Sequence, residues 1–397
     1  MNPDLQLLQP YPFQKLAKLL GEVTPNAALK PISLHIGEPK HATPQFIKDA
    51  LVAGLDGLAK YPTTTGSDAL RTTIANWLAD RYGIPAPDAK TRILPVNGSR
   101  EALFAFAQAV IDRSKMDPVV VCPNPFYQIY EGAALLSGAT PHFLNTLPED
   151  NYALNFAQLP EDVWQRTQLI YVCSPGNPNG RVMPLAEWQT LFEMSDRYGF
   201  VIAADECYSE IYFGENKPLG ALQAAQQLGR LEYRNLVVFS SLSKRSNVPG
   251  LRSGFVAGDA GILEKFALYR TYHGCAMNPA VQSATIAAWS DESHVEENRR
   301  LYAEKFAKVI ALLAPVLPIS RPDAGFYLWI KTPVADTSYA QHLYRDYNVS
   351  VLPGSFLARE VRGVNPGSDF IRLALVASLD ETLEAARRIA EFTQKLN

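Results

Sequence analysis

The chain has 397 residues, of which 47% are hydrophobic, so it can bury a substantial core and fold as one large domain or as two. Lysine and arginine total 37 against 40 aspartate and glutamate, and the formal charge of -3 offers no long-range attraction to nucleic acid or to an anionic membrane. We therefore expect neither a nucleic-acid partner nor a membrane partner.

Targeting signals and metal-binding patterns are both missing from the sequence. Residues 1–14 lack the basic and apolar regions of a secretory signal, and no stretch reaches the roughly 18 to 20 apolar residues of a spanning helix. A cytoplasmic protein is therefore expected. The histidines form no H-E-x-x-H pattern and the cysteines no C-x-x-C pair, so the sequence predicts no metal site and buried free thiols.

Short apolar runs alternate with helical patterns from about residue 92 onward, which is typical of βα units. Strands are predicted at 93–96 and 119–122, each followed by a helix, at 101–111 and 127–136. Several runs are apolar without alternation, which indicates strands covered on both faces in a mostly parallel sheet. Further strands of this kind are expected at 169–173, 200–204, 236–240 and 254–257.

The pattern changes near residue 279 to long helical stretches, at 280–289 and 294–313. Strands are then predicted at 325–330, 349–352 and 370–374. We therefore expect a large domain over 36–279, a smaller α+β domain over 280–397, and an N-terminal arm, 1–35, that joins the smaller domain.

Polar signatures follow three of the predicted strands. Lys244 lies in a loop of hydroxyl residues after 236–240, Asp205 follows 200–204 with Tyr208 three residues later, and the turn 174–180 contains Asn177. Taken singly, these are an ordinary solvated lysine, a helix cap and a turn. Because ligands bind beyond the carboxyl ends of parallel strands, the three together predict one ligand site.

The motifs S-x-S-K and G-x-R-x-G around Lys244, N-P-N-G at Asn177 and D-E-x-Y at Asp205 occur in the order found in a known family. With Gly37 near the start and Arg372 near the end, the chain resembles the fold type I pyridoxal-phosphate-dependent aminotransferases of class I/II over nearly its whole length. The resemblance implies an α/β fold with a mostly parallel central sheet, pyridoxal 5'-phosphate as cofactor, and a homodimer with shared active sites.

The resemblance also assigns roles to the residues at the strand ends. Lys244 would bind the cofactor aldehyde covalently and later carry the α-proton of the substrate, a task suited to a lysine whose pKa is lowered. Asp205 would face the pyridine nitrogen and favour its protonated form. Asn177 and Tyr208 would hydrogen-bond the phenolic oxygen of the cofactor.

Other positions would bind the phosphate, the ring and the substrate. The phosphate donors would be the amides of Gly98, Ser99 and Arg100 at a helix N-terminus, with Ser241, Arg252 and, from the neighbouring subunit, Tyr61. The side-chain role of Arg100 is left open, because this position often carries a smaller or neutral residue. Tyr127 would stack on the ring, with Phe126 beside it as the alternative. Arg372 would grip the substrate α-carboxylate, supported by the backbone of Gly37.

The reaction that this resemblance implies is transfer of an amino group between amino acids and 2-oxo acids in two half-reactions. Overall the chain is most similar to the succinyldiaminopimelate aminotransferases of bacterial lysine synthesis, with Arg270 and His273 as candidates for reading the far end of the substrate. The alternatives are an aspartate or aromatic aminotransferase, a carbon–sulfur β-lyase or a cyclopropane-forming synthase of the same fold. A transcription factor of this fold would need a long DNA-binding head, for which residues 1–36 leave no room.

Overall fold

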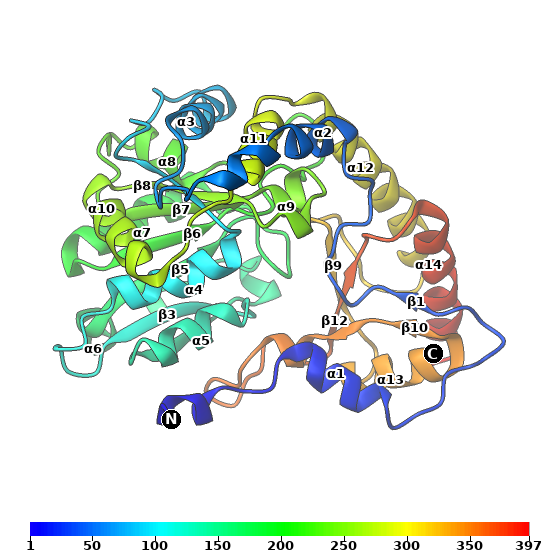
Figure 1. Cartoon of the computed structure of the whole chain (residues 1–397). Coiled ribbons are helices and arrows are strands. Elements are labelled where there is room, and N and C mark those ends of the chain that lie inside the picture. The colour runs from blue at the N-terminus through cyan, green and yellow to red at the C-terminus, as the bar shows by residue number, and fades with distance from the viewer. Residues whose placement is uncertain (397) are drawn as a thin grey trace.

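A seven-stranded sheet forms the centre of the larger lobe of the molecule (Figure 1). The computed structural model describes residues 1–396, and within them this sheet has the order β2-β8-β7-β6-β5-β3-β4. The run from β7 to β4 is parallel, whereas β8 is antiparallel to both of its neighbours. Its strands are β2 (Ile93–Val96), β3 (Val119–Asn124), β4 (Thr140–Asn145), β5 (Thr167–Cys173), β6 (Val201–Asp205), β7 (Leu236–Ser241) and β8 (Gly254–Gly258).

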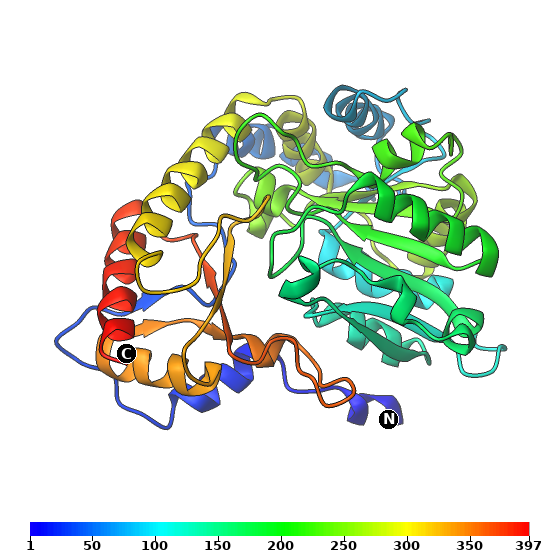
Figure 2. The same cartoon turned by 180° about the vertical axis from the view of Figure 1, so that it is seen from behind.

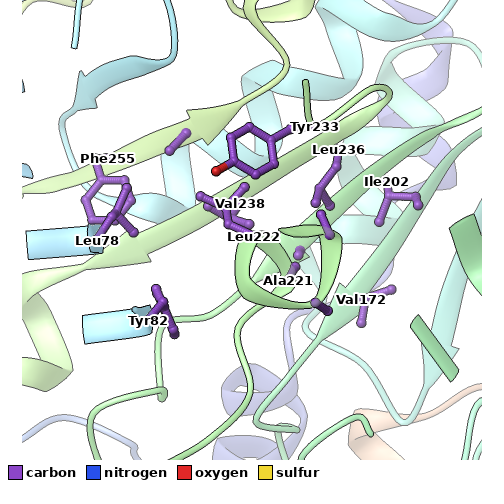
Figure 3. Close-up of a cluster of buried hydrophobic side chains, with 14 of the residues drawn as sticks. Leu78, Tyr82, Val172, Ile202, Ala221, Leu222, Tyr233, Leu236, Val238 and Phe255 are labelled. Atoms are coloured by element: carbon purple, nitrogen blue, oxygen red, sulfur yellow. The ribbon is translucent and has the colours of Figure 1, made fainter. Parts of the chain in front are cut away.

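Both faces of this sheet are covered by buried apolar side chains. Ile202 and Val238 belong to one core cluster (Figure 3), whereas Ala203, Val237 and Phe239 of the same strands belong to another. Because successive strand side chains point to opposite faces, the two clusters lie on the two sides of the sheet. The expected mostly parallel α/β sheet is thereby confirmed.

The helices divide between the two faces of the sheet. The cluster shown in Figure 3 receives side chains from α3 (Asp68–Tyr82), α6 (Glu161–Arg166), α7 (Leu185–Tyr198), α8 (Ala221–Gln227) and α11 (Pro279–Trp289). The opposite cluster receives them from α4 (Ser99–Val110), α5 (Ile129–Leu136) and α10 (Ala260–His273). Side chains cap several of these helices at their N-termini: Ser67 for α3, Asp259 for α10 and Asn278 for α11.

The smaller lobe holds its own core and two small sheets (Figure 2). β9 (Tyr327–Lys331), β12 (Phe370–Ala374) and β11 (Leu352–Pro353) form an antiparallel sheet, and β1 (Ile32–Ser33) pairs in parallel with β10 (Val349–Ser350). The helices of this lobe are α12 (Ser293–Leu313), α13 (Asp336–Tyr347) and α14 (Leu379–Gln394), and α1 (Pro12–Leu20) packs against α13. The remaining helices are α2 (Gln45–Ala53) and α9 (Leu242–Arg245).

The single strand predicted at 349–352 is wrong. The chain changes partner at Val351, so Val349 pairs with β1 whereas Leu352 pairs with β12. One apolar run therefore supplies two short strands to two sheets. Its continuous hydrophobicity reflects burial, since Val349, Val351 and Leu352 are all fully buried.

The predicted domain boundary falls at the start of α11. This helix packs against α2 and α3, and its residues Ala284, Ala288 and Trp289 join the core cluster on that face of the large sheet. We propose that the boundary be moved to the segment between α11 and α12. The division of the chain into 1–35, 36–279 and 280–397 is otherwise still a prediction.

No helix in residues 1–396 has both the length and the apolar content needed to cross a bilayer. The cytoplasmic location expected from the sequence stays a prediction.

Candidate active site

A cavity of about 480 Å³ opens between the carboxyl edge of the large sheet, the smaller lobe and the N-terminal arm. This volume is typical of a cofactor or substrate site. Most of the side chains predicted to act together line it: Gly37, Ser99, Arg100, Tyr127, Asn177, Asp205, Tyr208, Ser241, Lys244, Arg252 and Arg372. Residues at or after the ends of β5, β6 and β7, which the sequence predicted to form one site, therefore line the same cavity.

Lys244 lies one turn beyond the end of β7, on the short helix α9, where the Ser243 amide donates to the capping hydroxyl of Ser241. Its Nζ donates a hydrogen bond to the Gly37 carbonyl oxygen at 2.5 Å. Burial lowers the pKa of Lys244 to about 8, since an apolar surrounding disfavours the charged form. The amine is thus partly deprotonated near neutral pH, which a nucleophile and proton carrier requires.

Gly37 tolerates no side chain. A Cβ atom at this position would lie 1.9 Å from the Tyr327 hydroxyl oxygen, inside any contact distance. The absence of a side chain lets the backbone of this segment pass beside Tyr327 and reach the Lys244 amine. Tyr327 was not singled out in the sequence, where it is one of several aromatic residues in a predicted strand.

Asp205 ends β6 with its carboxylate buried at the floor of the cavity. The Tyr130 hydroxyl donates to its Oδ2 at 2.7 Å, and the backbone amide of Cys207 donates to its Oδ1 at 3.2 Å. Burial raises the pKa of Asp205, and these two hydrogen bonds and the charge of Lys244 oppose that rise. The carboxylate is therefore held in one orientation, in which it can pair with a cationic atom of a ligand.

Arg372 is nearly fully buried, yet within residues 1–396 it forms no ion pair with a carboxylate. Its Nη1 donates to Asn177 Oδ1 and its Nη2 to the His35 carbonyl oxygen, both at 3.0 Å, and its Nε has no partner among the described residues. The guanidinium also lies 4.2 Å from the centre of the Tyr327 ring. A buried guanidinium held only by neutral groups on the wall of a cavity is suited to bind a carboxylate.

The donors predicted for a phosphate group also face this cavity. α4 begins at Ser99, directly after Gly98, whose φ of 89° and lack of a side chain allow the Arg252 guanidinium to lie against it. Ser241 and Arg252 also line the cavity, so amides at a helix N-terminus, a hydroxyl and a guanidinium face the same space. This donor set, with Asp205 and Lys244 beside it, fits pyridoxal phosphate.

Arg100 differs from the other cationic groups because two tyrosines hold it. Its Nε donates to the Tyr127 hydroxyl at 2.6 Å and its Nη2 to the Tyr11 hydroxyl at 3.2 Å. No carboxylate pairs with it in the part of the chain that the structure describes. Tyr11 comes from the N-terminal arm, 89 residues away in sequence, so no local pattern pointed to this contact.

The alternative between Phe126 and Tyr127 is decided in part by their burial. Phe126 is buried in the core, where its ring packs at a tilt against that of Phe143, whereas Tyr127 lines the cavity. Only Tyr127 is therefore in position to touch a bound ring.

A series of hydrogen bonds between largely buried side chains ends at the backbone carbonyl oxygen of Lys244. Lys305 donates to His41 at 2.7 Å, the other His41 nitrogen contacts Asn298 Oδ1 at 2.7 Å, and the Asn298 amide donates to the Lys244 carbonyl oxygen at 3.3 Å. Burial, with the charge of Lys40, lowers the pKa of Lys305 to about 8. None of these contacts is visible in the sequence, because α12 meets the segment after Gly37 only in the folded chain.

Besides Gly98 and Phe126, three residues named in the sequence lie outside the cavity lining. Tyr61 is fully exposed and touches no part of this chain's own site. Arg270 is fully buried in an ion pair with Glu101, so it cannot read a substrate of this site, and that expectation is wrong. His273 lies exposed at the end of α10, away from the cavity lining.

Comparison with known proteins agrees with this geometry. The family model for aminotransferase class I and II matches residues 30–389. The chain is 31% identical over 394 residues to the LL-diaminopimelate aminotransferase of Nitratidesulfovibrio vulgaris, which covers 98% of this chain and 97% of that one.

Two solved structures extend the likeness to the fold. An aminotransferase from Neisseria meningitidis superposes with a TM-score of 0.96 at 52% identity, over 99% of this chain and 100% of that one. The aromatic aminotransferase from Pyrococcus horikoshii superposes with a TM-score of 0.83 at 26% identity, over 96% of this chain and 99% of that one.

Proposed function

The chain belongs to the aminotransferase class I and II family, and we propose that its amino donor is N-succinyl-diaminopimelate and its acceptor 2-oxoglutarate, as in lysine biosynthesis. It is a pyridoxal-phosphate-dependent aminotransferase that acts on amino acids and 2-oxo acids. The observation that carries the proposal is the pair of arginines, Arg372 and Arg100, that line one cavity with Lys244 and have no carboxylate partner among residues 1–396.

Each group in the cavity has a task in this proposal. Arg372 binds the α-carboxylate of the substrate, which brings the α-carbon toward Lys244. The Lys244 amine takes the α-proton and returns it during the reaction, since its lowered pKa leaves it able to accept a proton near pH 8. The bound cofactor supplies a carbonyl group for the amino group and a ring that takes up the negative charge left by the proton.

The remaining residues hold the cofactor. Asp205 pairs with the ring nitrogen, and its contacts with Tyr130 and Cys207 keep the carboxylate in place. Asn177 uses its Oδ1 to accept from Arg372, so its Nδ2 is the atom that donates to the cofactor, beside the Tyr208 hydroxyl. The phosphate binds to the amides at Gly98, Ser99 and Arg100 and to Ser241 and Arg252, and the Tyr127 ring covers the pyridine.

The position of Arg100 in the cavity favours a substrate with a second carboxylate. With Arg252 facing the phosphate donors, a monocarboxylic amino acid contacts only Arg372 among the remaining arginines of the cavity, and the exposed Arg100 then stays solvated. A distal carboxylate satisfies it with a charge-assisted hydrogen bond, and the two tyrosines hold the guanidinium in place for that contact. Both N-succinyl-diaminopimelate and 2-oxoglutarate carry such a group.

The relatives support diaminopimelate as the core of the substrate, while their name, LL-diaminopimelate aminotransferase, carries no succinyl group. The two donors differ in chemistry at the far amino group, which is cationic in LL-diaminopimelate and a neutral amide in the succinyl form. An aspartate or aromatic aminotransferase stays the second reading, since the phosphate, ring and α-carboxylate contacts are common to all of them.

The substrate assignment is tested by assaying the wild-type enzyme and a variant that lacks the Arg100 guanidinium. We expect the purified enzyme to convert N-succinyl-diaminopimelate with 2-oxoglutarate at a higher kcat/KM than LL-diaminopimelate, aspartate or tyrosine. Arg100→Gln should lower kcat/KM for that pair by about ten- to a hundredfold, the loss of one charge-assisted hydrogen bond, and leave alanine with pyruvate unchanged. Arg113→Gln, an exposed arginine outside the cavity, is the matched control.

Three outcomes would contradict the assignment. A higher kcat/KM for LL-diaminopimelate moves the assignment to that donor, and an equal loss with alanine removes Arg100 from distal recognition. Release of ammonia and pyruvate without an oxo-acid acceptor would make the enzyme a β-lyase.

We also propose that the enzyme works as a homodimer with shared sites. Large apolar side chains are exposed on α2, on the segment after it and on α10: Val52, Leu55, Leu58, Leu268 and Tyr272. The Thr271 hydroxyl contacts that of Thr64 at 3.3 Å, so the end of α10 lies beside the segment that carries Tyr61. An apolar surface of this kind favours association, and it would direct Tyr61 into a neighbouring subunit.

A mixture of two variants, one weakened in cofactor binding and one inactive, tests the sharing of sites. Tyr61→Phe should weaken phosphate binding by about ten- to a hundredfold, because it removes a hydrogen bond to a charged group. In a heterodimer of Tyr61→Phe and Lys244→Ala subunits, one site has both residues intact if Tyr61 acts across the interface. Co-expression should then restore about a quarter of wild-type activity at limiting cofactor, since half of the dimers are mixed and each has one intact site. Activity no higher than that of the Tyr61→Phe homodimer would place Tyr61 in its own subunit's site.

A further inference from the structure

We propose that Glu101, His273 and Cys275 form a binding site for a zinc-like divalent metal ion. Each offers one donor atom, and the three atoms all lie within 4.8 Å of one another. The Cys275 Sγ and the His273 Nδ1 are already 3.1 Å apart. None of the three lines the cavity of the candidate active site, so this is a second site, independent of the substrate proposed above.

Two of the three ligands, His273 and Cys275, lie at the C-terminal end of α10. The helix ends at His273, and Gly274 follows with φ 82° and its amide bonded to the Arg270 carbonyl oxygen. This left-handed residue reverses the chain, so the Cys275 side chain folds back toward the His273 ring. Glu101 comes from the first turn of α4, which packs against α10.

The carboxylate of Glu101 is oriented by its own partners. The Asn97 amide donates to Oε1 and the Arg270 guanidinium to Oε2, both at 2.8 Å. Ligating carboxylates in metal sites are commonly held in this way, and each oxygen keeps a further lone pair for a metal. The buried charge of Arg270 opposes a cation, so the site should bind less tightly than a four-ligand structural site.

The donor types select the class of metal. A thiolate and an imidazole favour zinc and its neighbours in the transition series, whereas magnesium and calcium prefer sites made of oxygen atoms. With metal–ligand distances of about 2.0 to 2.3 Å, tetrahedral donors lie roughly 3.3 to 3.7 Å apart. The longest separation in the cluster therefore needs to shorten by no more than about 1.5 Å, and the Cys275–His273 pair to widen slightly, which the exposed His273 and the half-buried Cys275 permit.

The side chains around Cys275 and His273 complete the cluster. Burial raises the pKa of Cys275, and the nearby Glu101 carboxylate raises it further while Arg270 opposes the rise. His273 lies beside the thiol, and the Tyr269 ring packs against its imidazole.

Cobalt(II) titration of the cofactor-loaded enzyme tests the site, since cobalt reports its ligands by absorbance and zinc then displaces it. We expect one equivalent per subunit, a thiolate-to-cobalt charge-transfer band, and loss of that band in Cys275→Ser. Cys275→Ser and His273→Gln should each weaken zinc binding at least tenfold, whereas His142→Gln, a half-buried histidine elsewhere, should not.

Two results would overturn the proposal. One is cobalt binding whose spectrum and affinity are unchanged in both Cys275→Ser and His273→Gln, which would locate the metal elsewhere, such as on the cofactor. The other is no stoichiometric binding by the wild-type enzyme at all. Because His273 is exposed, the His273→Gln variant should fold even if the cysteine variant does not.

Discussion

Replacing Lys244 with alanine is expected to lower kcat for transamination by at least about a thousandfold, the scale of a lost acid–base group that also binds the cofactor. Lys244 is the only lysine among the described residues that line the cavity, so no other amine can take its place. Its environment is built for this task, because burial lowers its pKa to about 8 and the Gly37 carbonyl oxygen fixes the position of Nζ.

The measurement is the steady-state rate with saturating donor and acceptor, followed by the same assay with added methylamine. A small amine that enters the cavity should restore part of the lost rate, because it supplies the missing base, and a misfolded protein would not be rescued. Lys308→Ala, on the exposed face of α12, is the control and should keep the wild-type rate. A Lys244→Ala enzyme with more than a tenth of the wild-type rate would remove this residue from the reaction.

Much of the fold could be predicted because its signal is local. Unbroken apolar runs at β3, β5, β6 and β7 indicated strands covered on both faces, and the two core clusters agree with that expectation. The site followed from the same pattern, since polar residues after parallel strands meet at one edge. Asp205 ends β6, and Lys244 lies one turn beyond the end of the neighbouring strand β7, which is hydrogen-bonded in register with β6.

The parts that could not be predicted depend on contacts between distant segments. Arg100 was left without a side-chain role, because its partner Tyr11 is on the N-terminal arm. Arg270 was misread as a candidate for the substrate, because nothing in its own segment reveals that Glu101 neutralises it. The cluster at His273 and Cys275 has no local signal for the same reason, since its third donor lies about 170 residues earlier in the chain.

Replacing Arg372 with lysine is expected to lower kcat/KM by about a hundred- to a thousandfold for every amino acid and oxo acid, a loss of roughly 3 to 4 kcal/mol. The guanidinium donates at once to Asn177 and to the His35 carbonyl oxygen, and its planar shape still presents N–H groups to a carboxylate. A lysine supplies a single charged point, so it cannot keep both contacts and also hold two substrate oxygens.

Comparing Arg372→Lys with Arg100→Gln shows which end of the substrate each arginine binds. If Arg372 binds the α-carboxylate, Arg372→Lys reduces kcat/KM for alanine and for N-succinyl-diaminopimelate by the same factor, because both carry that group. Arg100→Gln should instead separate the two substrates. The urea midpoint of Arg372→Lys should fall only modestly, because the charge is kept although one of the contacts with Asn177 and the His35 carbonyl oxygen is lost. An Arg372→Lys enzyme that is slow only with dicarboxylic substrates would exchange the roles of the two arginines, and the substrate would then lie in the cavity in the opposite direction.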